Sequence, residues 1–180
     1  MSDDGNWTAL DSVTNNANAE IPREYHRGND ALGGYYNWYA ATAESLMAAA
    51  GNVTLSAEDS ICPAGWQLPK SGNSATDKSF SGLFFGAYHL NNASSNEQAK
   101  PIFTLPFLTP KNGLYDGNSG TINYRGNSAL FYSSTMSFPS KTAYILDAVY
   151  TIFPTYVVGY LHPSVSGGYL AGYGVRCVRK

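Results

Sequence analysis

The three histidines are the first side chains that could hold a metal ion, and their positions argue against it. His26, His89 and His162 lie far apart, and none has a cysteine, a histidine or a carboxylate at the spacing of zinc ligands. The only turn rich in Asp and Asn, residues 116–118, offers too few carboxylates for a calcium site. We therefore predict no bound metal ion and no cofactor.

The two cysteines, Cys62 and Cys177, are the candidates for redox or nucleophilic chemistry. Their even number and long separation permit one disulfide, which would add on the order of a few kcal/mol of stability. The alternative is a pair of buried thiols that only pack. Nothing near either residue in the sequence would activate a thiolate, so neither interpretation makes the cysteines catalytic.

Motifs of nucleophilic or phosphate chemistry do not occur. The sequence has no Gly-x-Ser-x-Gly elbow, Walker loop or dinucleotide fingerprint. Lone serines such as Ser133 and Ser134 have no identifiable histidine partner, and packing of their hydroxyls is the better interpretation. The chain is therefore predicted not to be an enzyme.

The stretch best suited to recognition runs from Thr142 to Arg179. It contains no Glu, Lys, Gln, Met or Trp, the types that no codon ending in a pyrimidine encodes, whereas the preceding residues contain all of them. It is rich in Tyr, Gly and small residues, which adaptable binding surfaces use. We predict a contact surface within 142–174, formed by Asp147, Tyr150, Phe153, Tyr156, Tyr160, His162, Ser164, Ser166, Tyr169 and Tyr173.

Two alternatives concern which aromatic and apolar residues are buried. Val149, Ile152, Val157, Val158 and alternate tyrosines of this stretch could be core, with only the turns exposed, and we expect a mixture. Earlier in the chain, an aromatic set could form a ligand box, but core is the better interpretation. We also expect Gly65 to let Trp66 turn inward. The aromatic set consists of Tyr35, Trp38, Trp66 and Phe131.

The first half of the chain must position these residues with few regular elements. Residues 1–33 are polar and weakly periodic, which predicts an irregular N-terminal arm. The aromatic residues 35–39 predict a strand or strand end. Residues 40–50 are strong helix formers followed by Gly51, a typical helix cap. The spacing of apolar residues in 76–90 predicts a second helix.

The second half predicts short strands and turns. Phe103, Leu105 and Phe107 alternate next to prolines, which predicts an edge strand. Turn signals recur at 112–113, 116–117 and 119–120. Apolar runs at 128–135, 143–149 and 175–178 predict strands, and the prolines and glycines between the last two predict loops and short strands. We expect one α+β domain over 1–180, with two early helices and a late, turn-rich, mostly antiparallel sheet.

Composition narrows the classes of partner. Only 13% of the 180 residues are charged, the formal net charge is −2, and no basic stripe occurs, which argues against nucleic acid. No apolar stretch is long enough to span a bilayer, so we expect no membrane insertion. The first ten residues are acidic and polar, and we expect no secretory signal there.

Several sequence pieces occur in an order that resembles a known family. These are GYYNWYAATA, ICPAGWQLP, RGNSALFYSST, AYIL and GYGVRCV. The series resembles the Fibrobacter succinogenes major paralogous domain, a module with the C-type-lectin-like fold, over residues 33–178. One departure is Phe131 in FYSS, where the family usually has Trp. The resemblance implies a single lectin-like domain in which 142–174 is the variable region and 175–180 the closing strand.

The resemblance also implies a function. Domains of this type serve as variable proteins of diversity-generating retroelements, which rewrite adenines near the 3′ end of the gene. The restricted residue types of 142–174 are similar to that signature, although such segments usually retain Asn and none occurs after Asn127. The expected function is non-enzymatic binding of a protein or surface polymer, at a cell surface or on a virion.

Two alternatives to this function stay open. One is an invariant adhesive or structural module of the same family at the cell surface. The other is a relative of formylglycine-generating oxidases, whose chemistry would need Cys62 and Cys177 reduced and adjacent.

Overall fold

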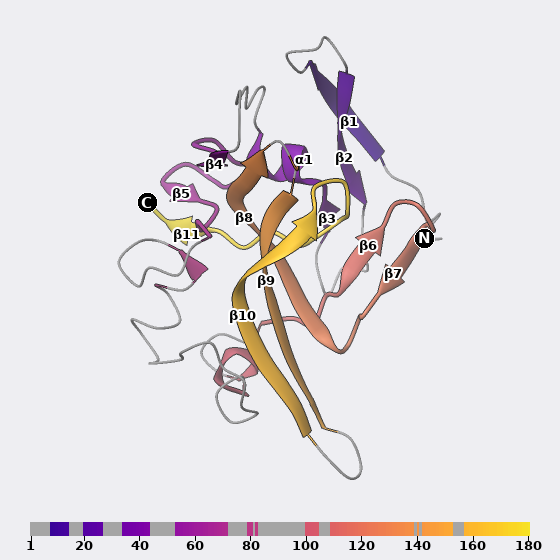
Figure 1. Ribbon diagram of the computed structural model, residues 1–180, viewed down its shortest axis with the longest axis vertical. Helices are drawn as coiled ribbons and strands as arrows, with labels where there is room; N and C mark the ends of the chain where they lie inside the picture. Colours follow the sequence, from indigo (N-terminus) through magenta and orange to yellow (C-terminus); the bar gives the residue numbers. More distant parts are fainter. Residues whose placement is uncertain are drawn as a thin grey trace.

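The structure of the protein is a computed structural model. Within the described part, the chain consists mostly of antiparallel strands with few helices (Figure 1). The described residues are 8–14, 20–26, 34–43, 53–71, 79–80, 82, 100–104, 109–138, 140, 142–152 and 157–180.

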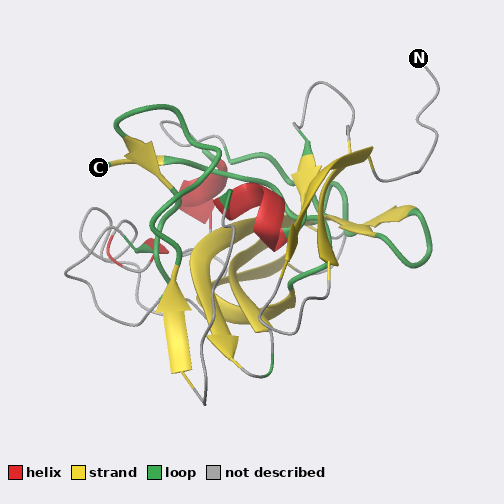
Figure 2. Ribbon diagram, turned by 90° about the horizontal axis from the view of Figure 1, so that it is seen from above, coloured by secondary structure: helices red, strands yellow, loops and turns green. Residues whose placement is uncertain are grey.

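A four-stranded antiparallel sheet forms the centre of the described structure. Its order is β10-β9-β8-β4, with β4 at Val53–Ser56, β8 at Ser128–Phe138, β9 at Thr142–Ile152 and β10 at Val157–Gly168. The three longest strands are strongly curved (Figure 2). The strands predicted at 128–135 and 143–149 are confirmed as β8 and β9, where apolar and β-branched side chains favour a pleated, buried backbone.

The prediction that prolines and glycines break the segment after β9 into short strands is wrong for β10. This strand runs over 12 residues, and its pairing register with β9 shifts between His162 and Val165. Pro163 lies within this shift, where the regular ladder of hydrogen bonds is interrupted. A proline has no backbone N–H to donate to a neighbouring strand. β10 is the last strand in the sheet order and has a partner strand on one side only, so it can contain a proline.

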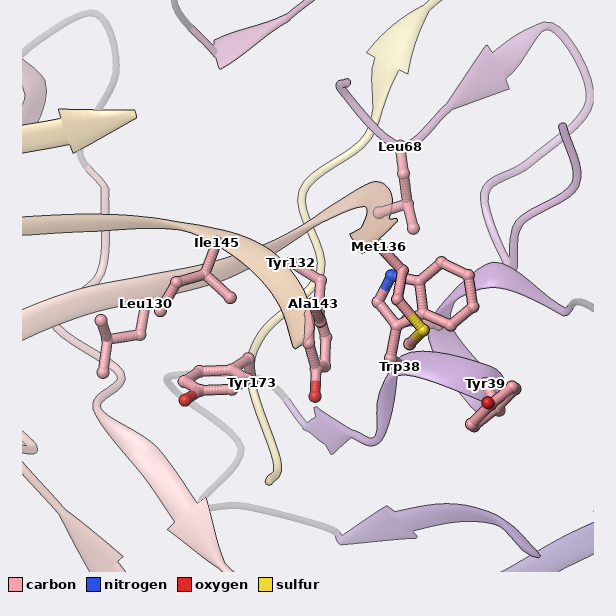
Figure 3. Close-up of a cluster of buried hydrophobic side chains, with 10 residues drawn as sticks. Trp38, Tyr39, Leu68, Leu130, Tyr132, Met136, Ala143, Ile145 and Tyr173 are labelled. Carbon is pink, nitrogen blue, oxygen red and sulfur yellow. The ribbon is translucent and has the colours of Figure 1, made fainter. Parts of the chain in front are cut away.

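Strand β8 is buried on both faces because alternate side chains pack into two clusters. Leu130, Tyr132 and Met136 belong to the first cluster, together with Ala143, Ile145 and residues that cover this face (Figure 3). Ala129 and Phe131 belong to the second cluster, with Leu146, Ala148, Phe80 and Ile102. Burial on both faces explains why the sequence of β8 is apolar without alternation. The covering residues of the first cluster include Trp38, Tyr39, Leu68 and Tyr173.

The core interpretation of the early aromatic set is confirmed for all but one residue. Tyr35, Trp38 and Phe131 are buried. Trp66, by contrast, is 45% exposed, so the prediction that it turns inward is wrong. It lies in β5, Trp66–Gln67, a two-residue strand whose only described partner strand is the equally short β11, Val178–Arg179. The predicted closing strand at 175–178 (or 175–180) is thus regular only at its end.

The first helix is shorter than predicted. Helix α1 spans Trp38–Thr42 and begins at Asn37, whose side chain accepts a hydrogen bond from the Ala40 N–H at 2.9 Å. It ends because Ala43 adopts a left-handed conformation, φ 52°, and because the Ala41 carbonyl accepts from the Ile61 N–H at 3.1 Å. A distant loop thus takes the acceptor that a continuing helix needs. Residues 44–52 lie outside the described residues.

The other helix prediction, 76–90, also falls mostly outside the described residues, which include only Ser79, Phe80 and Gly82 of it. The edge strand predicted from Phe103 is wrong at its start, because Lys100–Phe103 forms a 3-10 helix, η1. Pro101 suits such a turn because its ring fixes φ near the helical value. Leu105 and Phe107 lie outside the described residues.

The prediction of an irregular arm over residues 1–33 is wrong for its described segments, 8–14 and 20–26. Strand β1, Thr8–Thr14, pairs antiparallel with β2, Glu20–His26, which in turn pairs with β3, Tyr35–Tyr36. Tyr36 then exchanges two backbone hydrogen bonds with Tyr173, at 3.0 and 3.1 Å. Pairing of this kind uses backbone groups, so weak side-chain periodicity did not reveal it.

The turn signals predicted at 116–117 and 119–120 are confirmed, whereas no turn forms at 112–113. Strand β6, Leu114–Asp116, and β7, Thr121–Asn123, form a hairpin around residues 117–120. The Asp116 carboxylate accepts hydrogen bonds from the Asn118 N–H at 2.9 Å and the Ser119 hydroxyl at 3.0 Å. These bonds lower the pKa of Asp116, the Asn118 bond most. The side chain of this aspartate thus shapes the turn.

Replacement of Gly113 by alanine should cost about 2 kcal/mol of unfolding free energy, twice the cost at Gly126. Both glycines have positive φ, +69° and +80°, so both replacements strain the backbone. Only at Gly113 would the new Cβ meet backbone, 2.2 Å from the Asn123 oxygen, whereas Gly126 has open space. Denaturant unfolding of both variants measures the difference, and equal losses would show that the backbone relaxes around the methyl group.

Candidate functional site

The predicted contact segment, 142–174, coincides with β9, β10 and the turn that follows. Residues directly opposite each other on paired strands share a face of the sheet. The register pairs Asp147 of β9 with Leu130 of β8 and with His162 of β10. It pairs Tyr150 with Gly159. Tyr150 is three residues from Asp147 along β9, so it lies on the opposite face of the sheet. The predicted contact residues are therefore divided between the two faces of the sheet.

Asp147 lies on the face that carries the first core cluster and is half-buried. Its negative charge contributes to the raised pKa of Tyr173, after the larger effect of burial. An electrostatic effect of this kind places the carboxylate near the Tyr173 hydroxyl. The structure thus puts Asp147 beside the core rather than on an open surface.

Tyr150 lies at the margin of the second core cluster and is half-buried. Its ring stacks on Phe103 with centroids 6.5 Å apart, and its carbonyl accepts a hydrogen bond from Lys111 Nζ. The same ammonium group lies 5.3 Å from the centroid of the Phe103 ring. Partial burial lowers the pKa of Lys111. Tyr150 therefore presents one side of its ring to protein and part of the side chain to solvent.

The end of β10 and the turn after it present the most accessible of the described candidates. Ser166, near the end of β10, is exposed, and Tyr169 in the turn is half-buried with its ring edge-to-face on Tyr39 at 5.9 Å. The backbone carbonyl of Tyr169 accepts from the Trp38 N–H at 2.9 Å, which fixes the turn against α1. Leu170, which follows Tyr169, is 44% exposed. The sequence did not single it out, because an aliphatic residue is more often part of a core.

Tyr173 is a correction to the predicted contact surface. It is 5% exposed and packs edge-to-face on Tyr132 in the first core cluster, with ring centroids 4.8 Å apart. Its backbone bonds to Tyr36 hold it beneath the surface. The tyrosine content of this segment therefore serves the core as well as the surface.

The remaining five candidates lie wholly or partly outside the described residues. Phe153 and Tyr156 lie outside them. Tyr160, His162 and Ser164 have backbone positions in β10, but their side chains are outside the described part. Of the residues proposed as core instead, Val149 is buried, which supports a mixture of core and surface positions along this segment.

A tyrosine that the sequence interpretation did not single out anchors the end of the segment. The buried Tyr132 hydroxyl lies 2.9 Å from the Gly168 carbonyl oxygen and 2.6 Å from that of Ala171. A hydroxyl carries one proton, so it donates to these acceptors in turn or shares the proton between them. At Gly167 a Cβ would come within 2.9 Å of Ile145 Cγ2, so glycine permits the close packing. The turn is thereby tied to the core.

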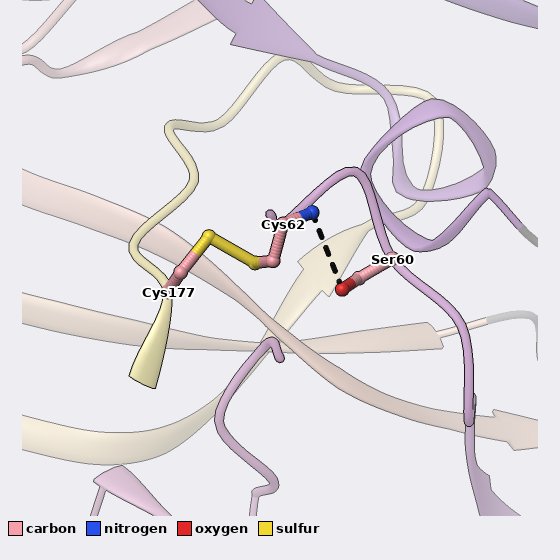
Figure 4. Close-up of a disulfide and its surroundings, with 3 residues drawn as sticks. All are labelled: Ser60, Cys62 and Cys177. Atoms are coloured by element: carbon pink, nitrogen blue, oxygen red, sulfur yellow. Dashed lines mark hydrogen bonds between the residues drawn. A yellow bond between two sulfur atoms is a disulfide. The ribbon is translucent and has the colours of Figure 1, made fainter. Parts of the chain in front are cut away.

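The two cysteines form a disulfide, one of the two alternatives that the sequence left open (Figure 4). Their Cα atoms are 5.8 Å apart, and the Cys62 N–H donates to the Ser60 hydroxyl at 3.4 Å. The bond joins the loop before β5 to the residues before β11. The oxidase alternative needs both cysteines reduced, which differs from the state in the structure.

Among the described residues, no group of three or more His, Cys, Asp or Glu side chains could hold a metal ion. Within the same part of the chain, no helix has the length and apolar character needed to cross a membrane.

Comparison of the chain with protein-family models, curated proteins and solved structures gave no match.

The buried tyrosines predict loss of stability at alkaline pH. Burial is the main cause that raises the pKa of Tyr39, Tyr132 and Tyr173, with a neighbouring negative charge as a further cause. When the pKa of a tyrosine is higher in the folded state, its contribution to stability is fully present below the unfolded pKa of about 10. This contribution is lost as the pH rises from that value through the folded pKa. We expect cooperative unfolding above about pH 10, measured by circular dichroism together with tyrosinate absorbance. Complete ionisation of all tyrosines in a folded protein would contradict this expectation.

Proposed function

We propose that the chain is a non-enzymatic binding protein with a C-type-lectin-like fold. Its contact surface lies on the hairpin of β9 and β10 and on the turn at 169–171, and it recognises a protein or a surface polymer at a cell surface or on a virion. The observation that supports this proposal is a shared start. The stretch with restricted residue types begins at Thr142, where β9 also begins, and the hairpin of β9 and β10 within it lies at an edge of the sheet.

The surroundings of this unit suit a surface that varies. The hairpin is fixed on its inner side by β8 and at its end by the Tyr132 hydroxyl and the α1 contacts of Tyr169. These contacts involve backbone atoms of 168–171, so they persist when exposed side chains change. A scaffold that holds a loop through its backbone permits substitution without loss of the loop conformation.

Burial limits the proposed surface to part of the segment. Ser166 and Leu170 are exposed, and Tyr150 and Tyr169 are half-buried. Asp147 is half-buried too, but its Oδ1 is buried beside the core, so the first four are the described candidates for contact. Aromatic side chains there give a large contact area at a small cost in conformational entropy. Recognition would rest on shape and aromatic contact, with no metal ion required.

The test is to sequence the 3′ end of the gene across its source population. Under the proposal, substitutions are concentrated in the codons for Tyr150, Ser166, Tyr169 and Leu170, at positions that match adenines in a nearby near-copy. The matched control codons within the same segment encode buried residues and should stay constant. These are the codons for Ala143, Leu146, Ala148 and Tyr173.

Two other outcomes would contradict the proposal. If all codons of 142–174 vary no more than those of 62–69, the protein is an invariant surface module instead. If buried and exposed codons vary equally, the variation is not directed at a binding surface.

A further inference from the structure

A pocket of about 320 Å³ lies on the scaffold, and none of its lining residues belongs to β9, β10 or the turn at 169–171. This volume is at the lower end of the range for small-molecule sites. Its walls combine polar and apolar surface in similar amounts and contain one cationic side chain, Arg176. The apolar wall residues are Tyr36, Ile61, Pro110, Phe131 and Val175.

Backbone hydrogen bonds hold the part of the wall formed by Phe131 and Gly174. Phe131 is 4% exposed. On either side of it, the Gly174 N–H donates to the Leu130 carbonyl at 3.1 Å, and the Gly174 carbonyl accepts from the Tyr132 N–H at 3.0 Å. A Cβ at Gly174 would lie 2.9 Å from Phe131 Cε1, so only glycine allows this contact. A pocket fixed in this way needs little reorganisation when a ligand binds.

Arg176 supplies the polar part of the site. Its side chain is half-buried, and Nη1 donates to the hydroxyl of the buried Thr109 at 3.4 Å, which orients the guanidinium group. Because the side chain is half-buried, water is partly excluded around the charge, and this burial lowers the pKa of Arg176. Attraction between opposite charges strengthens where water is excluded. A guanidinium group binds carboxylates through paired N–H donors.

The disulfide holds two parts of the wall together. Ile61 directly precedes Cys62, and Arg176 directly precedes Cys177, so the bond between the cysteines fixes these two lining residues relative to each other. Ile61 is also held through its N–H, which donates to Ala41 O at 3.1 Å. Its side chain is 39% exposed, so it lies in the wall but remains accessible to solvent.

We propose that this pocket binds a small carboxylate with an apolar body, a site separate from the proposed contact surface. The carboxylate contacts the guanidinium group of Arg176, and the apolar body contacts Tyr36, Ile61 and Phe131. Such a ligand could be a free aromatic acid or the C-terminal residue of a peptide, because both present a carboxylate next to an apolar group. The inference does not depend on the proposed function.

The first experiment is a fluorine NMR titration with para-fluorobenzoate, compared with the neutral para-fluorobenzamide. We expect the acid to bind at least about tenfold more tightly than the amide, because a charge-assisted bond to Arg176 forms only with the acid. A peptide ending in a free Phe carboxylate, compared with its amidated form, distinguishes the peptide source from the free acid. Equal affinity for acid and amide, or no binding of either acid at millimolar concentration, would overturn the proposal.

Variants identify the site. R176Q should weaken binding of the acid about tenfold, whereas R179Q, which replaces an exposed arginine outside the pocket, should leave it unchanged. Because R176Q removes a half-buried group, a pair of variants at the accessible Ile61 provides an independent test. I61E should weaken binding of the acid by repulsion, and the matched I61K should not. If R176Q and I61E both bind the acid as the unsubstituted protein does, the carboxylate is not held in this pocket.

Discussion

Replacement of both Cys62 and Cys177 by serine should lower the free energy of unfolding by about 4–5 kcal/mol. The disulfide joins residues 115 positions apart, so it closes a loop that contains β5 to β10. In the unfolded chain such a bond removes a large number of conformations, and its stabilisation grows with the length of the loop. Both cysteines are half-buried, so a serine hydroxyl can reach water at either position.

Denaturant unfolding of the double variant and of the oxidised and reduced unsubstituted protein measures this effect. Reduction should give the same loss as substitution, because both remove the same constraint. Ser60→Ala is the control, since it removes the hydroxyl that accepts from Cys62 but leaves the disulfide, and it should cost no more than about 1 kcal/mol. A loss of under about 1 kcal/mol in the double variant would mean that the unfolded chain is already restricted in other ways.

Replacement of Asn112 by alanine should cost about 3 kcal/mol of unfolding free energy. The side chain of this buried residue accepts from the Leu130 N–H at 3.0 Å and donates to the Leu130 carbonyl at 2.8 Å. Strand β4 pairs with β8 only at residues 135–138, so at Leu130 the asparagine amide takes the place of a neighbouring strand. Without it the Leu130 N–H loses this acceptor inside the protein, although the Leu130 carbonyl keeps the Gly174 N–H.

The matched control is Asn118→Ala, because Asn118 lies exposed in the hairpin turn and its bond to Asp116 uses the backbone N–H. This variant should stay within about 0.5 kcal/mol of the unsubstituted protein. Chemical denaturation of both variants gives the comparison. If Asn112→Ala loses as little as the control, water or a backbone shift satisfies Leu130, and the amide does not stabilise the edge of β8.

The candidate contact surface could be located from the sequence only as a segment. Residue types marked a stretch that begins at Thr142, but they did not separate the exposed Ser166 from the buried Tyr173. Tyr173 is buried because its backbone pairs with Tyr36, a residue far away in the sequence. No local pattern around a tyrosine records such a partner, and Tyr serves a core as well as a surface.

The pocket and the anchor of the turn were also beyond the sequence. The pocket combines lining residues from 34–36, 61, 110, 131 and 174–176, which only the fold brings together. Tyr132 was part of a recognised apolar run, but its hydroxyl reaches carbonyls more than 35 residues away. Its role follows from the close approach of β8 to the turn after β10.

The sequence by itself determined the features that depend on neighbouring residues. Apolar runs determined β8 and β9, and the turn residues around Asp116 determined the β6–β7 hairpin, because strand preference and turn geometry are local properties. The tertiary structure decided the features that depend on hydrogen bonds between backbone groups far apart in the sequence. It ended α1 at Thr42 by giving the Ala41 carbonyl to Ile61, and it kept β10 intact past Pro163 by placing that strand at an edge. It also joined Cys62 to Cys177, since distance in space, and not spacing along the chain, determines which thiols can bond.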